Sequence, residues 1–323
     1  MLDSNKFIEL ESLNIIARSK LIEYGFLSSH TQTTLTPNYS VILNGTKYSH
    51  YIITCSNSAV KFFLKLSKGN DNSLHCNEFL KIFRNNDEYA YPIILVPEFK
   101  YKSVNYYITT YTEGNNLDTL SSSLTKNEWK KISHELRKQL DNLSTIKATM
   151  YSEKNQFLNI GCADILKNKF QKRLNHVVFG QFDPTSIMKA YDRSCEILNH
   201  CQFSDPTLLH MDVKPANVIY NPQTRTVKLI DFEFARFGDW DFGWTQILLT
   251  KCNFFSKEYK EYMFPYLTEG RLTLDEALTI PKYKCYLFYQ TACNLIYYFD
   301  KKQECPQEMY QLFMDLLNCL SQE

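Results

Sequence analysis

The hydrophobic pattern divides the first third of the chain into a helix followed by short strands. Residues 4–25 carry apolar side chains three or four positions apart, among them Leu10, Leu13 and Leu21, which predicts a helix that ends at Gly25. Short runs rich in β-branched and aromatic residues then alternate with turn residues such as Asn44-Gly45, which predicts strands. We expect strands at residues 39–43, 48–54, 60–66, 93–96 and 105–110, with a second helix at 73–84.

The pattern changes at Glu113-Gly114-Asn115-Asn116, beyond which helical spacing dominates. A single β-rich island, residues 208–234, interrupts the helices. The sequence therefore predicts an α+β fold with two lobes: a small antiparallel sheet with a helix in residues 1–112, and a larger, mainly helical lobe in residues 113–323. The helices of the second lobe are expected at residues 126–143, 164–178, 184–200, 282–300 and 306–319.

Composition and charge narrow the class of protein. Hydrophobic residues make up 44% of the 323 residues and the net charge is +1, which favours a well-packed core and gives no overall footprint for nucleic acid. The ten cysteines contain no C-x-x-C pair, so neither a zinc nor a disulfide framework is expected. No signal peptide or membrane-spanning apolar run is evident, and we expect a cytoplasmic protein without a membrane partner. The sequence does not indicate the oligomeric state.

The β-rich island contains the residues that best indicate chemistry. It has the pattern H-x-D-x-x-x-x-N, from His210 through Asp212 to Asn217, followed by an apolar strand that ends in Asp231. Phosphoryl transfer uses these residue types, because a carboxylate orients the attacking hydroxyl, while an amide oxygen and a second carboxylate hold Mg²⁺ on the nucleotide phosphates. The order and spacing of the residues favour a phosphotransferase over a chance cluster of polar residues in a loop.

This segment resembles the motifs of the protein-kinase superfamily, and most closely the aminoglycoside phosphotransferase and choline kinase branch. That branch has H-G-D-x-x-x-x-N followed by I-D-[WF]-E, and this chain has Ile230-Asp231-Phe232-Glu233 with Met211 in the place of the glycine. No Ala-Pro-Glu follows Asp231, which argues against a protein kinase. The resemblance implies a bilobed kinase-like fold.

The resemblance also implies roles for the residues of the island. Asp212 matches the catalytic base or substrate-orienting residue, and Asn217 and Asp231 match the metal ligands. Lys214 is a candidate contact of the γ-phosphate, although small-molecule kinases often have another residue there. The remaining candidates are His210, which would brace the loop, Asp241, which would accept hydrogen bonds from it, and Glu233, which would support the metal.

In the first lobe the resemblance implies a lysine that binds the α- and β-phosphates and a glutamate that holds it. Lys65 best fits the end of the third strand, with Lys61 as the alternative, and Glu78 fits the helix. The nucleotide loop lacks G-x-G-x-x-G, and its position between the first two strands is equally well explained as a plain hairpin. The candidate contacts of the nucleotide are Gly45 and Ser49 in this loop, and Thr110, Tyr111 and Thr112 in the hinge.

The sequence therefore predicts a Mg²⁺-dependent enzyme that moves the γ-phosphate of ATP or GTP to a hydroxyl of a small molecule. An aminoglycoside-like antibiotic or amino alcohol ranks first, and choline, ethanolamine, homoserine or a sugar are alternatives. The acidic last third and its many aromatic residues suit a cationic acceptor, but they equally suit an ordinary acidic surface and an aromatic core. A protein kinase, and a catalytically dead kinase-like binding or scaffold protein, are the readings from other classes.

Overall fold

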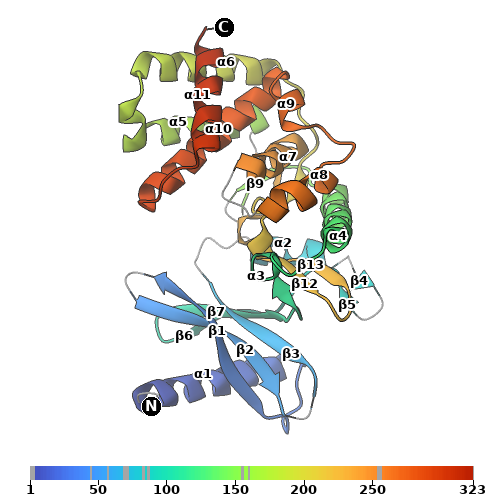
Figure 1. Ribbon diagram of the computed structural model, residues 1–323. Helices are drawn as coiled ribbons and strands as arrows, with labels where there is room; N and C mark the ends of the chain where they lie inside the picture. Colours follow the sequence, from blue (N-terminus) through green and yellow to red (C-terminus); the bar gives the residue numbers. More distant parts are fainter. Residues whose placement is uncertain are drawn as a thin grey trace. The chain divides into compact units, whose positions relative to one another are not determined.

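The computed structural model of the chain describes residues 4–43, 46–56, 58–67, 73–81, 84–85, 88–153, 156–158, 161–252 and 257–322. These residues form two compact units. Unit 1 comprises Met1–Gly114 and Asn221–Phe234, and unit 2 comprises Asn115–Tyr220 and Ala235–Glu323. The second segment of unit 1 is the part of the β-rich island that contains Asp231. Figure 1 labels the elements of both units.

Unit 1 is built on a five-stranded antiparallel sheet with the strand order β1-β2-β3-β7-β6. The register of β1 and β2 runs from Thr33 opposite Cys55 to Leu43 opposite Thr46. The turn predicted from Asn44-Gly45 lies outside the described residues. The strands of this sheet are β1 (Thr33–Leu43), β2 (Thr46–Cys55), β3 (Lys61–Leu66), β6 (Ile94–Tyr101) and β7 (Val104–Thr110). The other elements of unit 1 are α2 (Ser73–Leu80), β4 (Arg84–Asn85), β5 (Glu88–Tyr89), β13 (Thr226–Leu229) and the 3₁₀ turn η3 (Phe232–Phe234).

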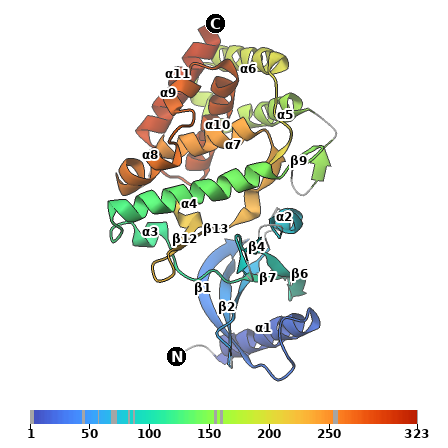
Figure 2. The ribbon, with the colours of Figure 1, turned by 90° about the vertical axis from the view of Figure 1, so that its right-hand side faces the viewer.

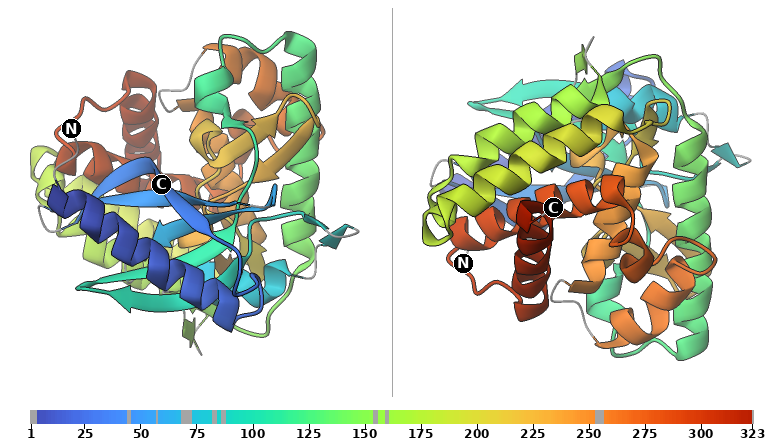
Figure 3. Two further views of the ribbon diagram at one scale, coloured as in Figure 1. Left: turned by 90° about the horizontal axis from the view of Figure 1, so that it is seen from below. Right: turned by 90° about the horizontal axis from the view of Figure 1, so that it is seen from above.

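Helix α1 (Ser4–Glu23) covers one face of this sheet, as Figure 3 shows in the view from below. Leu13, Ala17 and Leu21 recur every fourth residue, so they lie on one helix face and join the buried core of the sheet. Gly25 ends the helix with φ +78°, a conformation that favours glycine. The amides of Gly25 and Phe26 then bond back to the carbonyls of Ile22 and Leu21. The predicted helix and its stop are confirmed.

Unit 2 is mainly helical, and several of its helix boundaries follow from capping residues. Thr125 and Glu128 form a capping box at the start of α4, which Figure 2 shows as one long helix. The Asp183 carboxylate accepts from the amides of Thr185 and Ser186, and Pro184 is the first residue of α6. The longer helices are α4 (Lys126–Thr145), α5 (Cys162–Leu174), α6 (Pro184–His200), α7 (Trp240–Leu249), α10 (Pro281–Asp300) and α11 (Gln307–Gln322).

The short elements of unit 2 connect these helices. Strand β12 pairs with β8, so that Ile219 lies opposite Asn116, and β11 pairs with β14. These elements are β8 (Asn115–Asn116), α3 (Leu117–Leu120), β9 (Tyr151–Glu153), β10 (Gln156–Leu158), η1 (Val177–Gln181), β11 (Thr207–Leu209), η2 (Pro215–Asn217), β12 (Val218–Asn221), β14 (Arg236–Gly238), η4 (Thr250–Cys252), the π-helix η5 (Tyr259–Met263), α8 (Phe264–Leu267) and α9 (Leu274–Ala277).

Aromatic side chains fill the core between α5, α10 and α11. The Phe170 ring lies 5.0 Å from the Phe288 ring in a T-shaped arrangement, and Phe288 stacks on Phe313 at 5.5 Å. Figure 3 shows α6 beside α5, and α11 across α10, in the view from above. Within the described residues, no helix combines the length and apolar character needed to cross a membrane. The predicted α+β class, with an antiparallel sheet and a larger helical part, is confirmed.

A very close contact joins β11, β14 and α7. Leu209, the last residue of β11, is only 2% exposed and packs against Gly238 and Gly243. A Cβ atom at position 243 would lie 2.8 Å from Leu209 Cδ2, and one at position 238 would lie 2.8 Å from Leu209 Cδ1. Both distances are far below van der Waals contact, so an added methyl group would have to displace the buried side chain of Leu209. The close approach of β14 and α7 to β11 therefore favours glycine at positions 238 and 243.

We expect Gly243→Ala to lower the free energy of unfolding by about 1–2 kcal/mol. Overpacking costs about 1–3 kcal/mol, which exceeds the gain of up to about 1 kcal/mol in helix propensity. Gly180→Ala is the matched control, because a Cβ there has nothing within 4 Å. Urea unfolding measures both variants. In a Leu209→Ala background the Gly243→Ala change should become neutral or stabilising, and an equal loss in both backgrounds would contradict this explanation.

Candidate active site

The loop of residues 210–217, which follows β11 in unit 2, presents a carboxylate held by two side chains. Oδ2 of Asp212 accepts from Nζ of Lys214 at 2.7 Å and from Nδ2 of Asn217 at 2.8 Å. Nδ2 of Asn217 also donates to the backbone carbonyl of Asp212 at 2.9 Å. Asn217 is buried, Asp212 is mostly covered and Lys214 is the most exposed of the three. The i, i+2 and i+5 spacing thus becomes one compact cluster.

The backbone of this loop is held in an uncommon conformation. Met211 has φ +66°, in the left-handed region where a residue with a side chain costs roughly 1–2 kcal/mol. This position is the one at which the sequence pattern H-x-D has glycine in the similar family. The next amide, that of Asp212, donates to Nδ1 of the buried His210 at 3.2 Å. Since Nδ1 accepts from this amide, His210 contacts the loop at its backbone.

In unit 1, Lys65 and Asp231 form an ion pair. Lys65, on β3, is 7% exposed, and its ammonium donates to Oδ1 of Asp231. Asp231 has φ +67°, so a second left-handed residue lies in this part of the sequence motif. The turn η3 follows, and its Phe232 ring packs edge-on against the buried Tyr91 ring at 5.6 Å. Lys65, the candidate for the phosphate contact, thus forms an ion pair with Asp231, a candidate metal ligand.

The alternative lysine has a different partner. Nζ of Lys61 lies 2.7 Å from Oε1 of Glu113 and 5.4 Å from the centre of the Tyr111 ring. The hydrogen bond to Glu113 raises the pKa of Lys61, and burial raises the pKa of the Tyr111 hydroxyl. Lys61 is therefore tied to the segment that follows β7, away from the carboxylate of Asp231 that Lys65 contacts. This difference separates two lysines that the sequence left as alternatives.

The other candidates of unit 1 lie in less distinctive surroundings. The Glu78 carboxylate is 75% exposed and accepts from Lys81 at 2.6 Å, while its predicted pairing with Lys65 stays a prediction. The amide of Thr110 donates to the Ile93 carbonyl at 3.0 Å, so this amide is already used within the sheet. Tyr111 and Thr112 follow the end of β7. Gly45 and the side chain of Ser49 lie outside the described residues.

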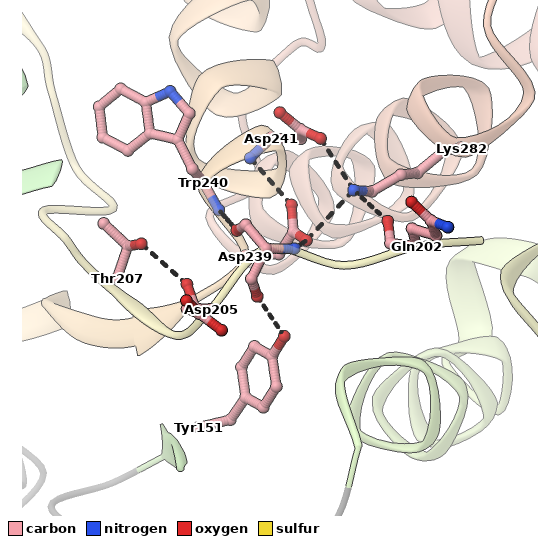
Figure 4. A network of polar contacts seen from close by, with 9 residues as sticks. Tyr151, Gln202, Asp205, Thr207, Asp239, Trp240, Asp241 and Lys282 are labelled. Atoms are coloured by element: carbon pink, nitrogen blue, oxygen red, sulfur yellow. Dashed lines mark hydrogen bonds and ion pairs between the residues drawn. The ribbon is translucent and has the colours of Figure 1, made fainter. Parts of the chain in front are cut away.

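Asp241 belongs to a polar network that closes the amino end of α7 (Figure 4). Nζ of Lys282, on α10, lies 2.8 Å from Oδ2 of Asp241 and 3.2 Å from Oδ2 of Asp239. The same ammonium donates to the carbonyl of Gln202 at 2.8 Å. Asp239 has no exposed side-chain surface and also accepts from the amides of Ser204 and Asp241 at 2.9 Å each. The network therefore fixes α7 and α10 to the segment that leads into β11.

Burial and charge act against each other in this network. Burial raises the pKa of Asp239, and the attraction of Lys282 opposes this rise only in part. Burial lowers the pKa of Lys282, but the bond to Asp241 and the charge of Asp239 outweigh burial, so the pKa is raised overall. Burial and the hydrogen bond to Asp241 raise the pKa of Tyr283. Lys282 is therefore the cation that partly offsets the burial of Asp239.

A residue that the sequence analysis did not single out makes contact with the 210–217 loop. Nε2 of Gln246, on α7, donates to the backbone carbonyl of Met211. Asp241 was expected in such a role, and its carboxylate is the acceptor for Lys282 in the network described above. A lone glutamine inside an apolar helix gives no local signal of this contact, because only the packing of α7 on β11 brings the two together.

Comparison with solved structures identifies the fold. The first match is aminoglycoside phosphotransferase APH(4)-Ia, with a TM-score of 0.63, 13% identity, and coverage of 95% of this chain and 97% of that chain. A ternary complex of a thermostable mutant of that protein with AMP-PNP and hygromycin B matches with a TM-score of 0.60, 15% identity, and coverage of 94% and 96%. A GDP complex of an aminoglycoside 2'-phosphotransferase-IIIa mutant matches at 0.55, with 14% identity and 96% of both chains.

The chain has the kinase-like fold of the aminoglycoside phosphotransferases. The resemblance stated from the sequence motifs is thereby confirmed at the level of the fold. Searches of protein-family models and of curated proteins give no match to this sequence.

We expect Lys282→Met to destabilise the protein by about 3–5 kcal/mol at pH 8, because it leaves a buried carboxylate without its cation. The pKa of Asp239 is already raised, so loss of Lys282 should raise it further, and the cost falls as the pH drops and the carboxylate takes up a proton. Lys282 itself stays protonated over this range, since its pKa is raised above 10.5. The deficit relative to wild type should therefore shrink from pH 8 to pH 5.

Urea unfolding at both pH values measures this effect. Lys301→Met, at the exposed end of the same helix, is the control and should change stability by at most about 0.5 kcal/mol at either pH. A deficit of Lys282→Met that is independent of pH would show that the lysine acts through packing alone.

Proposed function

We propose that this protein is a Mg²⁺-dependent phosphotransferase that moves the γ-phosphate of ATP or GTP to a hydroxyl of a small molecule. The observation that carries the proposal is the state of the Asp212 carboxylate. Lys214 and Asn217 hold Oδ2, while Oδ1 accepts no hydrogen bond from the described residues. A carboxylate fixed in this way suits a hydroxyl that must be oriented and must lose its proton during the transfer.

The residues proposed to hold the metal have the right chemistry. The Asn217 amide nitrogen is used twice by Asp212, and its oxygen accepts no hydrogen bond from the described residues. Asp231 supplies a carboxylate, and hard oxygen ligands of this kind suit Mg²⁺, which takes its remaining ligands from phosphates and water. When bound, Mg²⁺ would neutralise charge on the phosphates. Asn217 belongs to unit 2 and Asp231 to unit 1.

Lys65 is the proposed contact of the α- and β-phosphates. Its ion pair with Asp231 supports this choice, because the lysine and the metal that serve one triphosphate must lie near each other. Lys61 is occupied by Glu113 instead. Since the Thr110 amide bonds within the sheet, we assign the contact with the purine edge to the backbone of Tyr111 and Thr112. We propose unit 1 as the nucleotide-binding lobe and unit 2 as the catalytic and acceptor-binding lobe.

The acceptor class is supported by the similar structures. Hygromycin B and kanamycin are bound in complexes of the aminoglycoside phosphotransferases that this fold resembles. Aminoglycosides are therefore the first acceptors to test, followed by amino alcohols and sugars. The aromatic residues of the last third do not add to this argument as a group, because Trp244, Tyr286 and Phe288 are buried in the core of unit 2.

We expect Asp212→Asn to lower turnover by about 10²–10⁴-fold, because the amide cannot accept the proton of the attacking hydroxyl. The Kd of Mg-nucleotide, measured by thermal stabilisation, should remain within about threefold of wild type. Asp192→Asn, an exposed carboxylate on α6, is the control and should leave both quantities unchanged. The proposed role of Asp212 would be wrong if Asp212→Asn lost nucleotide binding together with turnover. The proposed function itself would fail if the wild-type protein neither transferred phosphate to an acceptor nor hydrolysed the nucleotide.

We expect Lys65→Met to weaken Mg-nucleotide binding by about 10- to 100-fold, since a charge-assisted contact with phosphate is worth about 1.5–3 kcal/mol. Lys61→Met removes the same charge from the same strand and should change the Kd by less than about threefold. Titration calorimetry with ATP and with GTP compares the two variants and also shows which nucleotide is preferred. The reverse order of effects would assign the phosphate contact to Lys61.

A further inference from the structure

One peptide group of the 210–217 loop is held at both of its ends. It is the group that joins Met211 to Asp212. Its carbonyl oxygen accepts from Nε2 of Gln246, and its amide donates to Nδ1 of His210 at 3.2 Å. A peptide group is planar, so fixing its oxygen and its nitrogen fixes the orientation of the plane and the direction in which the next Cα leaves it. The residue whose Cα leaves this plane is Asp212.

The conformation of Met211 explains why such holding is needed. With φ +66°, Met211 is in a region that a residue with a side chain leaves readily when nothing opposes it. Rotation about the N–Cα bond of Met211 would relieve this strain, and it would carry the following peptide group and the carboxylate of Asp212 with it. His210 opposes the rotation from the amide side. Gln246 opposes it from the carbonyl side, where no other hydrogen bond to this oxygen is made by the described residues.

The helix that carries Gln246 is itself firmly placed. Gly243 lies three residues before Gln246, hence on the same face of α7, and it contacts Leu209 immediately before the loop. The amino end of α7 is capped by Asp239, which Lys282 and the Ser204 amide also bind (Figure 4). Gln246 thus lies on a short helix whose amino end is held in place. A side chain that orients another residue needs such a rigid support.

We propose that Gln246 is a positioning residue for Asp212 in phosphate transfer. It donates to the Met211 carbonyl and so keeps the strained peptide group in the orientation that aims the Asp212 carboxylate at the acceptor hydroxyl. This inference rests on the proposed function, because it gives Gln246 a role in the reaction through Asp212. Gln246 does not itself contact either substrate in this proposal.

The test compares two glutamines that each donate to a backbone carbonyl. Gln246→Leu removes the donor to Met211, and Gln246→Glu keeps the shape but offers a carboxylate that cannot donate when ionised. Gln290→Leu is the matched control, because the buried Gln290 donates to the Phe242 carbonyl at 2.8 Å and has no contact with the loop in the described structure. Stability is followed by urea unfolding for all three variants.

Both Gln246 variants should lower kcat by about 10- to 100-fold, as expected when a reacting group is misplaced by about 1 Å. The KM values for nucleotide and acceptor should stay within about twofold of wild type. Gln290→Leu should lose a similar amount of stability but keep kcat within about twofold. The proposal is overturned if Gln246→Leu keeps the wild-type kcat, or if kcat falls equally in the Gln290→Leu control.

A second measurement does not depend on turnover. Amide hydrogen exchange of the substrate-free protein should become faster at residues 211–217 in Gln246→Leu, and should be unchanged there in Gln290→Leu. Equal exchange in the two variants overturns the proposal. If wild type transfers phosphate neither to an acceptor nor to water, the proposed function fails, and exchange alone then decides whether Gln246 holds this peptide group.

Discussion

The contact of Leu209 with two glycines is the constraint on which the 210–217 loop of the candidate site depends. It brings β14 and α7 so close to β11 that a Cβ atom at position 238 or 243 would lie 2.8 Å from the Leu209 side chain. Because α7 comes this close, Gln246 reaches the Met211 carbonyl, and the loop that follows Leu209 starts from a rigid base. A looser contact would leave a strained loop supported only by its own residues.

A polar network beside this contact pairs two carboxylates with one cation. Lys282 lies between Asp239 and Asp241, and Asp239 uses its remaining capacity to cap α7 and to bind the Ser204 amide. A buried carboxylate without a cation would be costly, whereas this arrangement lets one carboxylate join three segments of chain. The hydroxyl of Tyr151 adds a bond to the Ser204 carbonyl at 2.8 Å, which holds the same segment from β9 (Figure 4).

The charged residues assigned to chemistry fall into two groups of different character. In unit 2, Asp212 is fixed by short contacts to Lys214 and Asn217 within one loop. In unit 1, Lys65 reaches Asp231 across a separation of 166 residues, so this pair exists only because the second segment of unit 1 returns to the sheet. Two left-handed residues, Met211 and Asp231, stand one in each group. Strained backbone at both places is consistent with residues selected for position more than for stability.

The sequence by itself located most of the local elements and predicted the chemical type of the candidate site. Helical spacing and caps located α1, α4, α6 and α10 within a few residues, and the spacing of Asp212, Asn217 and Asp231 indicated phosphate chemistry because these positions are close along the chain. Helix α7 was not predicted, since its apolar run between Gly238 and Thr250 has no clear periodicity. The sequence already ranked Lys65 above Lys61, and only the tertiary structure shows the ion pair of Lys65 with Asp231, the Lys282 network and the contact of Gln246. Each of these contacts joins groups that are tens of residues apart in the sequence. Such contacts are set by how whole helices and strands pack, and the local sequence pattern does not encode that packing.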